Sequence, residues 1–327
     1  MKKIALEEHF GTPEFMRLRS DWLARMGMPM NLPEEALKRM VFLAGDVEQR
    51  LEEMDKYDIA YQILLPGTTS VDGVLDHNEA LDVSKKHNEA VAKIVDAHQD
   101  RFLAYASIPW QAPELAAKEL ERCSKEYKGF VGAWLSGYIH NTGFVDEEQF
   151  SPIFETGENL GSHFYIHPTE TDPMFAKLYD GCEALLGPPW GWGVETGTFV
   201  LRMILNGVFD RYPGTSLIMA HMGEMLPFIL WRLENRLVRE NKIGNLKMSI
   251  PEYFRDNISI TISGCLSDQA LRCSIDTIGA DRIMFSMDYP YEPMGPTCEF
   301  IESAALDENE RALICYKNAE KLFGLSA

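Results

Sequence analysis

Short apolar runs recur along the chain, and each is followed by a stretch with the apolar spacing of an amphipathic helix. The runs that predict strands lie at residues 4–9, 61–65, 102–109, 130–135, 163–167, 217–221, 258–263 and 283–288. The stretches that predict helices lie at residues 47–57, 78–98, 113–127, 147–160, 198–209, 225–241, 267–278 and 308–325. Eight strands that alternate with eight helices are typical of a parallel (β/α)8 TIM barrel, an α/β fold.

We expect a single barrel domain over residues 1–327, with insertions on its C-terminal face at two places. Residues 12–44 separate the first strand from its helix, so they form either a lid or subunit contact, or a plain helical excursion over the barrel mouth. Residues 181–196 are rich in glycine and tryptophan and follow the fifth strand. Their glycines do not match a dinucleotide-binding pattern, so nucleotide binding is not supported.

The charge balance narrows the possible partners. Fifty acidic residues against 31 basic ones give a formal net charge of −19, which excludes nucleic acid and an anionic membrane surface as expected partners. No secretory signal or membrane-length apolar run is present, and the six cysteines form no Cys-x-x-Cys pair. We therefore expect a cytoplasmic protein with reduced cysteines, and leave the role of Cys265, just after a predicted strand, open.

Glu7, Glu8 and His9 end the first predicted strand. Side chains alternate between the faces of a strand, so Glu7 and His9 share one face while Glu8 points to the other. A carboxylate and an imidazole side by side can hold two corners of a divalent metal site. Taken alone, these residues favour a strand that simply ends in polar residues at the solvent edge.

Three further residues with metal-ligating side chains end predicted strands. His167 ends the fifth run, His221 the sixth and Asp288 the eighth. The C-terminal ends of barrel strands form the rim where such enzymes gather their catalytic groups. Each residue alone is compatible with a buried histidine or a capping aspartate. Together with Glu7 and His9, they indicate a metal site.

The other five histidines serve as a comparison. His77, His87 and His98 lie in or beside a helical segment rich in charged residues and are expected to face solvent. His140 lies in a predicted loop, and His163 begins the fifth predicted strand. We assign none of the five a functional role.

Several motifs together resemble the amidohydrolase superfamily, specifically its branch of metal-dependent, non-oxidative decarboxylases. The motifs are ALEEHF, FLAYASIP, GFVGAWLSG, FYIHP, LLGPPWGW, IMAHMGEMLPF followed by WR, and RIMFSMDYP. They span nearly the whole chain. Members of this branch act on amino-carboxymuconate semialdehyde, γ-resorcylate, 2,3-dihydroxybenzoate and 5-carboxyvanillate, and the hydroxybenzoate decarboxylases are the most similar.

The resemblance implies one divalent metal ion. Most amidohydrolases open with His-x-His on the first strand, whereas this chain has Glu7-x-His9, as the hydroxybenzoate decarboxylases do. The fourth strand region, residues 129–137, has no interior lysine, so a lysine carbamate bridging two metals is not expected. Zinc or manganese suits the mixed donors, and magnesium is possible. By resemblance the ligands are Glu7, His9, His167 and Asp288.

The resemblance also implies decarboxylation of a small aromatic carboxylate with an ortho-hydroxyl group. A metal ion can chelate the carboxylate and phenolate oxygens, while a nearby acid protonates the ring carbon before CO2 leaves. The resemblance suggests Asp288 as that acid. His221 would lie near the metal as a catalytic or hydrogen-bonding group, with Glu224 fixing its tautomer and proton supply. Glu224 is equally compatible with a first-turn helix residue.

Three residues are candidates for substrate binding. Arg232 matches the position where relatives place an arginine near the substrate, although it is also compatible with a surface arginine. Trp190 and Tyr291 can wall an aromatic ring or pack in a core or loop.

Two other functions and an assembly state complete the expectations. A metal-dependent hydrolase of the same fold, such as a lactonase, is the main alternative, and a barrel that binds a ligand without turnover is another. Residues 224–241 carry an apolar face larger than one barrel contact needs. We therefore expect a homodimer or homotetramer.

Overall fold

The computed structural model describes residues 1–12, 45–67 and 76–325, together with single positions 15, 17, 18, 21, 24, 38 and 71. The insertion expected at residues 12–44 lies almost entirely outside the described residues. Within the described chain, no helix has both the length and the apolar character needed to cross a bilayer.

Eight parallel strands within the described residues form one sheet, as the alternating pattern predicted. In sheet order they are β1 (Lys3–Phe10), β2 (Ile59–Pro66), β3 (Phe102–Ala106), β4 (Phe130–Leu135), β7 (His163–Ile166), β8 (Ser216–Met219), β9 (Ile258–Thr261) and β10 (Ile283–Met284). The N–H of Leu6 donates to the carbonyl of Phe285 at 3.2 Å, and the N–H of His9 donates to the carbonyl of Tyr289 at 2.7 Å. These bonds join β1 to the segment after β10 and close the barrel.

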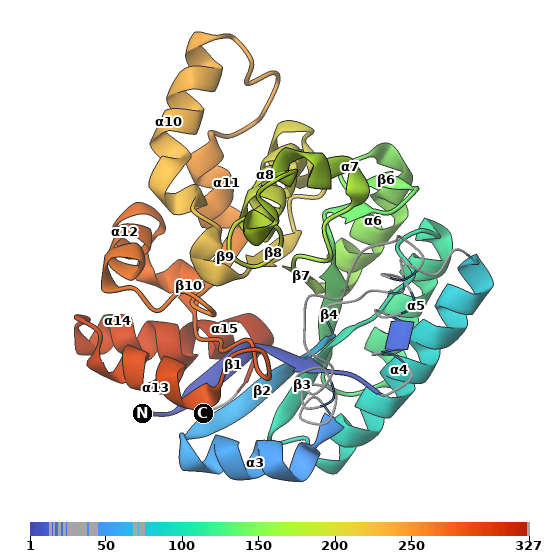
Figure 1. The fold of residues 1–327 in the computed structure, drawn as a ribbon. Coiled ribbons are helices and arrows are strands. Elements are labelled where there is room, and N and C mark those ends of the chain that lie inside the picture. Colours follow the sequence, from blue (N-terminus) through green and yellow to red (C-terminus); the bar gives the residue numbers. More distant parts are fainter. Residues whose placement is uncertain are drawn as a thin grey trace.

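Helices cover the outside of the barrel (Figure 1). Those that follow the predicted stretches are α3 (Val47–Lys56), α4 (His77–Ala97), α5 (Pro113–Glu126), α6 (Ser151–Leu160), α8 (Gly191–Leu205), α10 (Leu226–Arg239), α12 (Asp268–Ile278) and α14 (Glu308–Ala312), which continues to α15 (Asn318–Phe323). Further elements are the pair β5 (Tyr138–Ile139) and β6 (Gly143–Phe144), with α7 (Pro173–Ala176), α9 (Val208–Arg211), α11 (Ile250–Asp256) and α13 (Met294–Ser303).

The segment of the second expected insertion, residues 181–196, is partly helical in the structure. It contains a 3₁₀ turn at Glu183–Leu185 and the first turns of α8, which begins at Gly191. Glycine at position 193 allows a close approach in the first turn of α8: a Cβ there would lie 2.6 Å from a carboxylate oxygen of Glu224.

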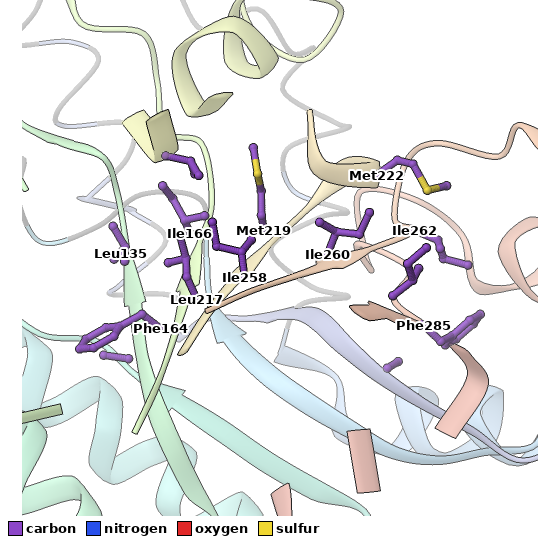
Figure 2. Close-up of a cluster of buried hydrophobic side chains, with 14 of the residues drawn as sticks. Leu135, Phe164, Ile166, Leu217, Met219, Met222, Ile258, Ile260, Ile262 and Phe285 are labelled. Atoms are coloured by element: carbon purple, nitrogen blue, oxygen red, sulfur yellow. The ribbon is translucent and has the colours of Figure 1, made fainter. Parts of the chain in front are cut away.

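The main hydrophobic core lies between the strands and the helices. Ile258, Ile260 and Ile262 point into it from β9 and its extension, beside outward-facing residues of β7 and β8 (Figure 2). A second cluster fills the barrel interior and includes Ile63 and Trp134. Because strand side chains alternate, the residues between the isoleucines of β9 face the barrel interior.

His87 does not face solvent as expected. It is 2% exposed, and its ring stacks on Phe15 with centroids 4.1 Å apart. Val83, Val91 and Val95 of α4 are buried as well. His87 therefore belongs to the buried stripe of this helix at four-residue spacing, and the polar residues around it concealed that position in the sequence.

Candidate metal centre

A β-bulge in β1 places an acidic residue on the inner face of the barrel. The register of β1 against β2 shifts between Ala5 and Glu8. Ala5 pairs with Gln62 and Glu8 pairs with Leu64, so β1 has one more residue than β2 over this stretch. Ala5 belongs to the outer core and Leu6 to the interior cluster. The extra residue lets Glu7 face inward directly after Leu6, against strict alternation.

Four side chains meet at the inner rim of the barrel. Glu7, His9, His167 and Asp288 each offer one ligand atom, and these atoms all lie within 4.8 Å of one another. Nε2 of His9 is 2.9 Å from Oδ1 of Asp288, and Nε2 of His167 is 3.2 Å from Oε1 of Glu7. The residues come from β1, the end of β7 and the segment after β10, as the strand-end positions predicted.

The two histidines of this cluster are held in the tautomer that metal binding needs. Nδ1 of His9 lies 3.1 Å from the carbonyl of Pro66, and Nδ1 of His167 lies 2.7 Å from the carbonyl of Pro168. A carbonyl only accepts hydrogen bonds, so each Nδ1 carries the proton and each Nε2 keeps a lone pair toward the cluster.

The remaining donors also fit a metal ion. Oε1 of Glu7, Nε2 of His9 and Oδ1 of Asp288 are buried, and none has a hydrogen-bond partner among the described residues. Buried polar atoms are normally satisfied, so unsatisfied atoms that converge on one point indicate a missing ligand. Two carboxylates and two imidazoles suit one divalent ion. β4 contributes no lysine, in keeping with a single ion.

His221 and Glu224 form a pair beside the cluster. Nδ1 of His221 is 2.8 Å from Oε1 of Glu224, while its Nε2 lies 3.5 Å from Oε1 of Glu7 and 3.7 Å from Oδ2 of Asp288. The turn after β8 sets this geometry, with His221 and Glu224 at φ values of 49° and 48°. Glu224 lies two residues before α10 begins and therefore outside its first turn.

The charges of this group determine where a proton resides. Burial alone raises the pKa of Asp288, but the neighbouring imidazoles of His221 and His9 lower it below the ordinary value. Burial alone lowers the pKa of His221, but the negative charges of Glu7 and Glu224 raise it well above the ordinary value. In this geometry His221 holds the proton, and Asp288 is ionised, the form that binds metal.

The candidates for substrate binding lie in different places. The ring of Tyr291 is 4.9 Å from that of His9 at 72°, so Tyr291 borders the cluster. Trp190 directly precedes α8 and is 45% exposed. Arg232 is exposed on α10, which projects from the barrel (Figure 1). Burial raises the pKa of Cys265, whose thiol is therefore neutral.

Glu8 faces the outside of the barrel, as strand alternation predicted. Its Oε1 accepts a hydrogen bond from the N–H of Met287 at 3.0 Å, and burial raises its pKa well above the ordinary value despite the positive charge of Arg50. Arg50 donates to the carbonyl of His9 at 2.6 Å and to Gln62 at 3.0 Å. These contacts fix the backbone of β1 from behind the cluster.

Three hydroxyl-bearing residues next to Glu7 were not predicted from the sequence. Tyr165, Thr261 and Ser263 lie inside the barrel and are fully buried. A signal for two of them was present, because Thr261 and Ser263 alternate with isoleucines in the seventh predicted strand. Polar residues on the inner face of a barrel strand indicate a buried polar partner.

Comparisons with known proteins agree with this architecture. The amidohydrolase family profile matches residues 28–325. The γ-resorcylate decarboxylase of Polaromonas sp. is 36% identical over 331 aligned residues, which cover 99% of this chain and 99% of that protein.

Solved structures give the same result. A 2,6-dihydroxybenzoate decarboxylase in complex with 2,6-dihydroxybenzoate has a TM-score of 0.91 at 33% identity, over 99% of this chain and 100% of that one. A dihydroxybenzoic acid decarboxylase from Polaromonas sp., with bound manganese and the inhibitor 2-nitroresorcinol, has a TM-score of 0.90 at 36% identity, over 99% and 97%. This chain therefore belongs to the amidohydrolase family, and its relatives are hydroxybenzoate decarboxylases.

Proposed function

We propose that this chain is a metal-dependent, non-oxidative decarboxylase of an ortho-hydroxylated aromatic carboxylic acid. The observation that carries the proposal is the buried cluster of Glu7, His9, His167 and Asp288, whose free donor atoms converge beside the His221–Glu224 pair. Relatives that act on γ-resorcylate and 2,6-dihydroxybenzoate support this substrate class.

In this proposal the four residues of the cluster hold one divalent ion. Manganese is supported by the relative from Polaromonas sp., which binds it, and the two imidazoles also suit zinc. When bound, the ion would supply Lewis-acid chemistry by chelating the carboxylate and phenolate oxygens of the substrate. Magnesium is the third candidate, because two of the four ligands are carboxylates.

The side chains around the cluster supply the proton. Direct decarboxylation of an arene leaves an unstable aryl carbanion, so the carbon that bears the carboxylate is protonated first. His221 holds a proton at Nε2, 3.7 Å from Oδ2 of Asp288, and Glu224 fixes its tautomer through Nδ1. Asp288 takes up this proton and delivers it to the ring carbon, and CO2 leaves as aromaticity returns.

The substrate contacts in this proposal come from three residues. Tyr291 walls the ring next to His9, where its position is supported by the edge-to-face contact between the two rings. Trp190 covers the ring from the start of α8, and Arg232 pairs with the anionic groups of the substrate.

We also propose that the protein is a cytoplasmic homodimer or homotetramer. Phe228 and Trp231 on α10 are 79% and 76% exposed, which is unusual for large apolar side chains on a monomer. All six cysteines are free, as expected in a reducing compartment. A solution mass equal to one chain would contradict the assembly.

A screen over hydroxybenzoates and lactones with the metal-loaded protein tests the reaction. We expect CO2 release from ortho-hydroxybenzoates and no opening of lactones. Lactone opening without CO2 release would assign the alternative hydrolase function. Absence of turnover on either panel, with no metal in the purified protein, would leave a ligand-binding barrel.

A further inference from the structure

Three hydroxyl groups form a connected chain against one oxygen of Glu7. The hydroxyl of Tyr165 donates to Oε2 of Glu7 at 2.9 Å, and the hydroxyl of Ser263 donates to the same oxygen. Thr261 Oγ1 lies 3.1 Å from the hydroxyl of Tyr165 and 3.2 Å from that of Ser263. The chain therefore runs from β7 across β9 to β1, inside the barrel.

The number of protons fixes the direction of these bonds. Each hydroxyl has one proton, and an ionised carboxylate oxygen only accepts. Tyr165 and Ser263 both donate to Glu7, so the single proton of Thr261 is left for only one of their two oxygens. Ser263 Oγ also lies 3.5 Å from the backbone N–H of His221, which can only donate to it. The hydroxyl of Thr261 can then donate its hydrogen bond to the hydroxyl oxygen of Tyr165, which has no other donor among these groups.

The two oxygens of Glu7 therefore have different surroundings. Oε2 accepts two hydroxyl donors, whereas Oε1 has no hydrogen-bond partner among the described residues. Oε1 is also the oxygen nearest the other ligand, 3.2 Å from Nε2 of His167. Hydrogen bonds to the outer atoms of metal ligands orient those ligands and tune metal affinity.

We propose that Tyr165, Thr261 and Ser263 are positioning residues that hold Glu7 by Oε2, so that Oε1 alone faces the metal ion. The inference rests on the proposed metal site. Hydroxyl groups are costly to bury without partners, and all three are fully buried where barrels usually carry aliphatic side chains. Ser263 also accepts a hydrogen bond from the backbone N–H of His221, so the same hydroxyl contacts both Glu7 and the residue that supplies the proton to Asp288.

The barrel interior offers a matched control for each main variant. The hydroxyl of Tyr105 is buried without a hydrogen-bond partner in the described residues, and its ring lies 5.4 Å from that of Tyr165. Ser286 is likewise fully buried, and its hydroxyl has no partner in the same part of the chain. Tyr165→Phe is thus compared with Tyr105→Phe, and Ser263→Ala with Ser286→Ala.

The measurement is the dissociation constant for Mn²⁺ of each metal-free protein, determined by competition with a chelator. We expect Tyr165→Phe and Ser263→Ala to weaken Mn²⁺ binding by about 10–100-fold. Tyr105→Phe and Ser286→Ala should bind as the unaltered protein does. Thr261 contacts Tyr165 and Ser263 but not Glu7, so Thr261→Val should weaken Mn²⁺ binding by less. This variant provides a further test of the proposal if one of the main variants fails to fold.

The outcomes separate this inference from the function proposed above. If the unaltered protein binds Mn²⁺ and the Tyr165, Thr261 and Ser263 variants bind it equally well, the positioning role is wrong while the metal site stands. Equal weakening in the two controls would also overturn it, because the effect would then belong to the barrel interior in general. If the unaltered protein binds neither Mn²⁺ nor Zn²⁺, the metal site and the inference both fail.

Discussion

Nε2 of His9 lies 2.9 Å from Oδ1 of Asp288, across the seam where the first and last strands of the barrel meet. The N–H of Asp288 donates to the carbonyl of Glu7 at 3.0 Å, so the same seam also positions the backbone of both residues. The contacts that close the barrel therefore also bring together Glu7, His9 and Asp288, three of the four residues of the proposed metal site. These three come from opposite ends of the sequence.

Asp288→Asn should abolish most turnover. The amide keeps a ligand oxygen and similar size, but it cannot take a proton from His221 and deliver it to the ring. We expect kcat to fall by roughly 10²–10⁴-fold, the range typical of lost general acid catalysis. Steady-state CO2 release with metal-loaded protein measures this. Asp256→Asn, at an exposed position, is the control, and near-full activity of Asp288→Asn would remove Asp288 as the proton donor.

Glu224→Gln should change the pH dependence of the reaction. The charge of Glu224 helps to raise the pKa of His221, so its removal lowers that pKa. The protonated imidazole then persists only to a lower pH, and the alkaline limb of the kcat profile should move to lower pH. We also expect kcat to fall by roughly 10–100-fold with little change in metal content. An unchanged alkaline limb would show that Glu224 does not act through His221.

His87→Phe should protect the fold against acid. Burial lowers the pKa of His87 to about 3, from 6.5 in a solvated histidine. The unfolded chain therefore takes up a proton between these values while the folded chain does not, so stability falls as pH drops below about 6.5. By pH 5 this amounts to about 2 kcal/mol.

Urea unfolding of both proteins at pH 7.5 and pH 5 measures the effect of His87→Phe. The phenyl ring keeps the contact with Phe15 but cannot titrate, so the difference in unfolding free energy between the two pH values should shrink. The matched variant His77→Phe alters an exposed histidine of the same helix. Equal pH differences in the unaltered and His87→Phe proteins would mean that His87 is solvated or hydrogen-bonded in solution.

Glu195→Gln should stabilise the protein above neutral pH. Burial, with a further contribution from the charge of Asp172, raises the pKa of Glu195 to about 7 from 4.5. The folded chain keeps a proton that the unfolded chain has lost, so stability falls as pH rises from about 4.5 to 7. The variant lacks this loss and should gain about 1–3 kcal/mol at pH 8 relative to pH 5. Parallel pH profiles of thermal unfolding for the two proteins would show that the pKa of Glu195 is not raised in the folded protein.

The barrel was predictable because its signal is distributed over the whole chain. Each apolar run alone is ambiguous, but the alternation of runs and helical stretches leaves few other folds. The convergence of Glu7, His9, His167 and Asp288 was predictable for the same reason, since parallel strands bring their C-terminal ends to one rim. The choice of these four as metal ligands came from the family resemblance.

The details that shape the site were not predictable in the same way. The bulge at Leu6 and Glu7 depends on the register between two strands, and no local pattern in β1 specifies it. Tyr165 looks like an ordinary core aromatic until its hydroxyl is placed against Glu7. His87 was misplaced because the charge of its neighbours outweighed its spacing from Val83 and Val91.

Metal dependence of CO2 release from 2,6-dihydroxybenzoate tests the proposed function most directly. The protein is stripped with a chelator, dialysed, and titrated with Mn²⁺ or Zn²⁺ while CO2 is measured. We predict no release without metal and recovery that saturates at one ion per chain. Full CO2 release from the stripped protein, or recovery that needs two ions per chain, would contradict a single-metal decarboxylase built on Glu7, His9, His167 and Asp288.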